Sequence, residues 1–125
     1  MEIIHTDNAP AAIGHYSQAT VSNGVVYVAG QLPIDPASGA VVEGEIEAQT
    51  AQALANVEAI LTEAGSSLSQ ILRATVYITD LSLFARLNAT YAAKLGDHKP
   101  ARAVVPVSEL PKGAMIEISA IAAIG

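Results

Sequence analysis

The chain has 125 residues and a net charge of −6, and it is 51% hydrophobic but only 14% charged. It has no cysteine, which excludes disulfides, thiolate catalysis and cysteine metal sites. Its six Lys and Arg residues are scattered without a run, which disfavours nucleic acid as a partner. The length predicts one domain over residues 1–125. Because so few residues are charged, we expect apolar surface to be covered by further copies of the chain.

The first ten residues, MEIIHTDNAP, have neither a positively charged start nor a long apolar stretch. They therefore do not predict a signal peptide. No run approaches the roughly 18 apolar residues that a membrane-spanning helix needs. We accordingly expect a cytoplasmic protein without a membrane partner.

In chain order, the pattern begins with a short strand and an irregular segment that together cover residues 1–19. Residues 25–34 form an apolar strand that Gly30 interrupts, and glycine inside a strand often marks a bulge or a close backbone approach. A turn at 35–41 leads to residues 45–65, where apolar side chains recur with the 3.6-residue period of a helix. Gly65 fits the position just past the end of that helix.

Residues 71–80 alternate as a strand does, with Leu72, Ala74, Val76 and Ile78 expected on one face and Ile71, Arg73, Thr75 and Tyr77 on the other. Asp80 is suited to cap a second helix over 81–96. Two strands, 101–107 and 114–124, close the chain around a turn at 109–113.

This order of elements predicts a mixed sheet with two helices. Each helix follows a strand as a crossover, so both helices should pack on one face of the sheet. The other face then needs cover. A closed ring of subunits with their sheets facing inward would supply it.

Three polar residues lie where the pattern favours apolar ones: Arg102 and Glu117 in the last two strands, and Asn88 on the apolar face of the second helix. A buried charge needs a partner. Arg102 and Glu117 could pair with each other as a structural salt bridge. Alternatively, the guanidinium could bind a ligand carboxylate, which would leave Glu117 free for proton transfer.

Other catalytic motifs are missing from the sequence. His5, His15 and His98 lack the spacing of metal ligands, and no serine stands in a G-x-S-x-G nucleophile motif. No glycine-rich nucleotide-binding motif is present. We therefore predict neither a metal site nor a cofactor.

Several segments together resemble the RidA/YjgF family over nearly the whole chain. The segments are NAPAAIGHYSQA, AGQLPIDPASGAV, the two predicted helices, and PARAVVPVSELPKGAMIEI with its Pro-Ala-Arg and Ile-Glu-Ile. The resemblance implies an α+β protomer and a homotrimer like chorismate mutase of the AroH type, with ligand clefts between subunits. It also implies a deaminase that hydrolyses 2-aminoacrylate, 2-iminopropanoate and 2-iminobutanoate to 2-keto acids and ammonia.

The resemblance also implies roles for individual residues. Arg102 would bind the substrate carboxylate, and Glu117 would orient the attacking water and move protons. Tyr16 would share the catalytic cleft and Asn88 would shape it, while the backbone of Gly30 would border the ligand. The reaction requires no cofactor, because an imine carbon is already electrophilic.

Three positions depart from the best-known members of the family. Ala29 replaces a common serine, His15 a common proline, and Val104 a common cysteine, although the N–H of Val104 would still be available to a carboxylate. Two other functions stay open. The arginine cleft could serve a non-catalytic binding module for 2-keto acids or similar carboxylates. The other is the ribonuclease or translation-inhibitor role attached to the family name, and the acidic composition counts against it.

Overall fold

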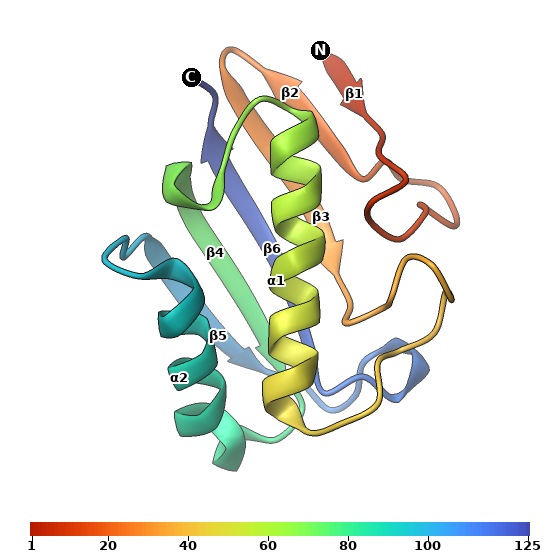
Figure 1. Ribbon diagram of the computed structural model, residues 1–125, viewed down its shortest axis with the longest axis vertical. Helices are drawn as coiled ribbons and strands as arrows, with labels where there is room; N and C mark the ends of the chain where they lie inside the picture. Colours follow the sequence, from red (N-terminus) through yellow and green to blue (C-terminus); the bar gives the residue numbers. More distant parts are fainter.

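A six-stranded mixed sheet forms one layer of the protein, as the computed structural model of residues 1–125 shows (Figure 1). Its strand order is β1-β2-β3-β6-β4-β5, and only β4 and β5 pair in parallel. The strands are β1 Glu2–Ile4, β2 Ala19–Ser22, β3 Val25–Gln31, β4 Ile71–Ile78, β5 Ala101–Pro106 and β6 Ile116–Ala123. Short 3-10 turns occupy Leu68–Gln70, Leu81–Leu83 and Pro111–Gly113.

Both helices, α1 Ile46–Glu63 and α2 Phe84–Leu95, lie on the same face of the sheet (Figure 1). Helix α1 packs on β3 and β6, and α2 packs beside α1. The side chains of Val57 and Ile60 from α1, Leu87 from α2, and Val76 and Ile116 from the sheet are completely buried between the two layers. The α+β fold with both helices on one face is therefore confirmed.

The opposite face of the sheet carries no helix. Along β6 every second side chain, beginning with Ile116 and Ile118, is buried under the helices, while Glu117, Ser119 and Ile121 between them are only half-buried. Since successive side chains of a strand point to opposite faces, the second set faces away from the helices. The uncovered face is thus as expected, and the ring of subunits that would cover it stays a prediction.

Strand β2 is an element that the sequence analysis misses, since only Ala19 falls in the segment expected to be irregular and residues 20–22 have no assignment. It pairs with β3 through a two-residue turn, in which both Asn23 and Gly24 have positive φ angles, 52° and 74°. Asn-Gly between apolar residues is the strongest short-range signal for a hairpin, because both central residues of such a turn need positive φ. The stretch VSNGVV therefore indicates the hairpin of β2 and β3, and this signal was available in the sequence.

The alternation expected for residues 71–80 is wrong at its first two positions. Ile71 is 3% exposed and Leu72 is 51% exposed, the reverse of the prediction. A register shift between Ile71 and Arg73 against β6 changes the face of each side chain before it. A second shift lies between Val28 and Gln31, where the interruption by Gly30 suggested a bulge.

The ends of the helices agree closely with the sequence pattern. Gly65 follows α1 with φ of 82°, a conformation that glycine adopts without strain. Asp80 caps the 3-10 turn Leu81–Leu83 that leads into α2, by accepting a hydrogen bond from the backbone N–H of Ser82 at 3.0 Å. Neither helix combines the length and the hydropathy that crossing a membrane requires, and the cytoplasmic location stays a prediction.

Candidate functional site

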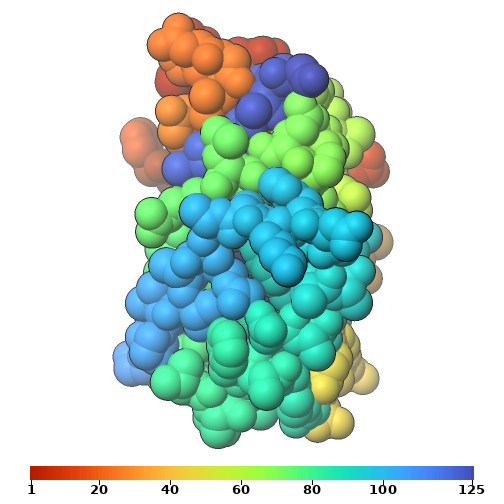
Figure 2. Space-filling view, turned by 90° about the vertical axis from the view of Figure 1, so that its left-hand side faces the viewer, coloured from red at the N-terminus to blue at the C-terminus, as the bar shows by residue number.

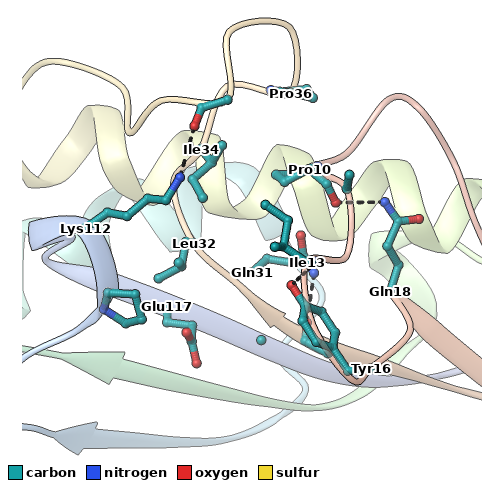
Figure 3. Close-up of a pocket in the computed structure, with 15 residues that line it drawn as sticks. Pro10, Ile13, Tyr16, Gln18, Gln31, Leu32, Ile34, Pro36, Lys112 and Glu117 are labelled. Carbon is teal, nitrogen blue, oxygen red and sulfur yellow. Dashed lines mark hydrogen bonds between the residues drawn. The ribbon is translucent and has the colours of Figure 1, made fainter.

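Glu117 lines a cavity of about 660 Å³ (Figure 3). Four separate parts of the chain form its wall: the loop before β2, the end of β3 with the loop that follows, the 3-10 turn Pro111–Gly113, and β6 itself. Two predicted site residues besides Glu117, Tyr16 and Gly30, line the same cavity. The structure therefore brings these three together.

Glu117 lies directly against the backbone of Gly30. A Cβ atom placed on Gly30 would be 2.5 Å from Oε2 of Glu117 and 2.8 Å from its Cδ, closer than such atoms approach each other. The bulge in β3 and the absent side chain thus create the space that the carboxyl group occupies.

The carboxyl group of Glu117 has no hydrogen-bond or ion-pair partner within the chain. Burial against the sheet removes part of its hydration and raises its pKa above the usual range of a glutamate. A carboxyl group with a raised pKa and no partner is suited to exchange protons with a bound molecule.

Tyr16 lies at the rim of the cavity and is 54% exposed. Its hydroxyl oxygen accepts a hydrogen bond from the backbone N–H of Ile13 at 3.3 Å, which holds the phenol ring against its own loop (Figure 3). That oxygen still carries a proton that it can donate to a ligand.

Buried amide side chains hold the loops around Glu117 in place. Gln18, 2% exposed, accepts a hydrogen bond from Thr6 N–H at 2.7 Å and donates to the carbonyl groups of Thr6 and Pro10, at 3.0 and 2.9 Å. These bonds close the loop that carries Tyr16.

Helix α1 fixes the other two loops in the same way. Asn56 donates to the carbonyl groups of Leu32 and Ile34 at 3.0 and 2.9 Å, and Gln49 accepts from Met115 N–H at 2.8 Å. The sequence analysis did not select these amides. Gln49 and Asn56 lie seven residues apart on the buried face of α1, where the other buried residues apart from Thr50 are apolar, and that spacing was the available signal.

Arg102 lies in a second cavity, of about 400 Å³, between α2 and the edge strand β5. Figure 2 shows the teal surface of α2 next to the blue surface of β5. One guanidinium nitrogen, Nη1, donates to Oδ1 of Asn88 at 2.8 Å. The group is also stacked near two aromatic rings, 4.9 Å from the ring centre of Tyr91 and 5.6 Å from that of Phe84. Asn88 and the two rings therefore orient the guanidinium from the side of α2.

Three expectations about Arg102 and its strand need correction. Arg102 is exposed in this chain rather than buried, because β5 is an edge strand paired only with β4. It forms no ion pair with Glu117, so the structural salt bridge between them is absent. Val104 is half-buried on β5 and lines neither cavity.

Arg102 and Glu117 also lie on opposite faces of the sheet. Arg102 is level with Ala74 of β4, which is buried under the helices, whereas Glu117 is level with Tyr77, which points the other way. Strand β4 separates their two strands. A single chain therefore contains two partial sites, one with Glu117, Tyr16 and Gly30 and one with Arg102 and Asn88.

The fold and the two partial sites define a class of small α+β proteins in which a sheet carries helices on one face and polar pockets at its edge and open face. The sequence profile described as Endoribonuclease L-PSP matches residues 6–124. The chain belongs to this family, also called RidA/YjgF.

Individual relatives match over almost their full length. A RutC family protein from Pyrococcus horikoshii is 50% identical over 121 residues, covering 97% of this chain and 96% of that protein. A 2-iminobutanoate/2-iminopropanoate deaminase from Salmonella typhimurium is 48% identical over 122 residues, covering 95% and 94%. The crystal structure of E. coli TdcF with bound serine superimposes with a TM-score of 0.95 at 38% identity, covering 100% of both chains.

Replacing Gly30 by alanine should push the carboxyl group of Glu117 out of its place. We expect Gly30→Ala to cost more free energy of unfolding in the wild-type chain than in a Glu117→Ala background, with a coupling of about 0.5–3 kcal/mol. Denaturant unfolding of the wild type, the two single variants and the double variant measures this coupling. Strictly additive effects would contradict the close approach.

Removing the charge of Glu117 should change how stability depends on pH. The raised pKa means that the folded state holds the proton more tightly than the unfolded chain does. The wild type therefore loses stability as the pH rises from the ordinary glutamate pKa through the raised one. In Glu117→Gln that loss is absent. The free energy of unfolding of the variant, relative to that of the wild type, should therefore increase across this pH interval. Unfolding curves at a series of pH values test this, and a difference that is constant with pH would refute it.

Proposed function

We propose that the protein is an imine deaminase that hydrolyses 2-iminobutanoate and 2-iminopropanoate to 2-keto acids and ammonia. The observation that carries this proposal is Glu117, an unpaired carboxyl group with a raised pKa in a cavity. Relatives named as such deaminases, 48% identical in Salmonella typhimurium and 44% in Bos taurus, support the same reaction.

The proposed active site needs two copies of the chain. Arg102 and Glu117 face opposite sides of one sheet, so no rearrangement of side chains joins them. A second copy whose uncovered sheet face meets the β5 edge of the first would place its own Glu117 near Arg102. We propose a homotrimer with three such clefts, where the number three follows from the family resemblance alone.

Arg102 is the proposed binding group for the substrate carboxylate. Asn88 occupies only Nη1, so Nε and Nη2 remain as donors. Those two N–H groups match the two oxygens of a carboxylate. Holding the substrate in this way fixes the position of its imine carbon relative to the acid.

Glu117 is the proposed acid–base group. As a carboxylate it takes a proton from water while the water oxygen bonds to the imine carbon, and it passes that proton to the imine nitrogen, which gives a neutral carbinolamine. In the breakdown of the carbinolamine, Glu117 takes the proton of the hydroxyl group and transfers it to the nitrogen, the C–N bond breaks, ammonia leaves, and the keto group remains. Such catalysis contributes roughly 10²–10⁴ in rate. Tyr16 is the proposed hydrogen-bond donor to the water or the substrate.

A binding module without catalysis is the second candidate. The TdcF structure holds serine, an amino acid with a carboxylate, which favours a site of this kind in relatives. A pure carboxylate binder needs Arg102 but has no use for Glu117. The endoribonuclease named in the family description has less support here, because the chain has a net charge of −6 and its six Lys and Arg residues form no run.

An imine-trapping assay tests the proposal. An amino acid oxidase generates 2-imino acids, and semicarbazide traps those that the protein fails to hydrolyse. Wild-type protein should reduce the trapped product, and Arg102→Ala or Glu117→Gln should lower kcat/KM by about 10²-fold or more.

Arg86→Ala is the matched control. It removes a guanidinium that pairs with Glu45 and Glu47 outside both cavities. Its activity should stay within about threefold of wild type. Full activity in Arg102→Ala would contradict the proposed carboxylate site. If the wild type hydrolyses no imine but binds 2-keto acids, the binding module replaces the deaminase.

A further inference from the structure

The cavity that contains Arg102 holds a second cation that the proposed reaction does not use. Lys99 lines this cavity, and the chain has only six Lys and Arg residues in total. None of the nine residues that line it is acidic.

Lys99 has no partner in the chain. Its ammonium group makes neither a hydrogen bond nor an ion pair, whereas Lys94 on α2 pairs with Glu58 at 3.2 Å and Arg102 is bound to Asn88. Lys99 and Arg102 both line this cavity, so it has two cationic residues and no acidic one in a protein with a net charge of −6. Such a concentration of positive charge attracts anions.

The loop that carries Lys99 is held in place. His98 donates from Nε2 to the carbonyl of Ile71 at 2.8 Å, because a carbonyl oxygen can only accept. The backbone N–H groups of Gly96 and His98 bond the carbonyls of Ala92 and Leu95 at 2.9 and 3.3 Å. These bonds satisfy two of the carbonyl groups at the end of α2 that would otherwise oppose an anion.

The cavity is also larger than one carboxylate requires. Its volume of about 400 Å³ lies within the range of sites that hold a whole small molecule. A ligand with one carboxylate on Arg102 leaves the part of the cavity next to Lys99 unfilled.

We propose that this cavity accepts ligands with two anionic groups, namely dicarboxylic 2-imino acids and the corresponding 2-keto acids. Arg102 binds the carboxylate next to the imine carbon, and the ammonium of Lys99 binds the second carboxylate. Lys99 is then a specificity-determining residue. This inference rests on the proposed function, in which Arg102 binds the substrate carboxylate.

Lys99→Gln tests the inference by comparing two substrates. D-Aspartate oxidase supplies 2-iminosuccinate, which has two carboxylates, and a general amino acid oxidase supplies 2-iminobutanoate, which has one. We expect Lys99→Gln to lower kcat/KM for 2-iminosuccinate by about three- to tenfold, the range for one partly exposed ion pair. The value for 2-iminobutanoate should change less than about twofold.

Lys94→Gln removes the same charge outside the cavity and should alter neither value. Added salt should reduce the preference for 2-iminosuccinate in the wild type more than in Lys99→Gln, because screening weakens an exposed charge pair.

Two results would overturn the inference while leaving the deaminase in place: an unchanged kcat/KM for 2-iminosuccinate in Lys99→Gln, or an equal loss for both substrates. If the wild type hydrolyses neither imine, the proposed function fails on its own. The affinities for oxaloacetate and pyruvate, measured by calorimetry in both proteins, then test Lys99 separately. A loss confined to oxaloacetate supports the inference, and equal affinities in the two proteins refute it.

Discussion

The alternation of side chains along the strands is the constraint on which the site depends. Residues level with each other on paired strands share a face, and the register places Arg102 with Ala74 and Glu117 with Tyr77. Those two residues of β4 are three apart, so they point to opposite sides. The proposed carboxylate-binding group and the proposed acid–base group therefore lie on different surfaces of one protomer, and assembly becomes a condition for the proposed activity.

The two partial sites are supported in different ways. The loops around Glu117 are bound to the core by the amides of Gln18, Gln49 and Asn56, whose loss would leave buried N–H and carbonyl groups without partners. These hydrogen bonds all form within one chain and need no ligand. Arg102, in contrast, depends on a single hydrogen bond and two aromatic contacts at an exposed edge. Its full desolvation, and the stronger binding that follows, would come from a neighbouring copy.

Much of the fold could be predicted from the sequence because both helices and four strands carry clear periods. The faces of individual side chains could not, since each bulge reverses the alternation, as Ile71 and Leu72 show. Arg102, Glu117 and Asn88 stood out in the sequence as polar residues in apolar segments, and the family resemblance supplied their proposed roles. Their division between two faces of the sheet was not predicted. Arg102 and Glu117 lie on the two strands that flank the same turn in the sequence, which suggested that the two side chains meet. In the sheet, however, β4 lies between these two strands, and β4 comes from an earlier part of the chain. Whether a strand lies at an edge is a property of the whole sheet, which is why Arg102 was expected to be buried.

Mixing two inactive variants tests most directly whether each active site is shared between copies. Arg102→Ala and Glu117→Gln are prepared separately, combined in equal amounts under conditions that exchange subunits, and assayed for imine hydrolysis, with exchange verified by native mass spectrometry. In a closed ring, half of the subunits keep Arg102 and half of their neighbours keep Glu117, so about one site in four should recover activity. Recovery near that level supports a site built from two copies. Verified exchange without any recovered activity would contradict it.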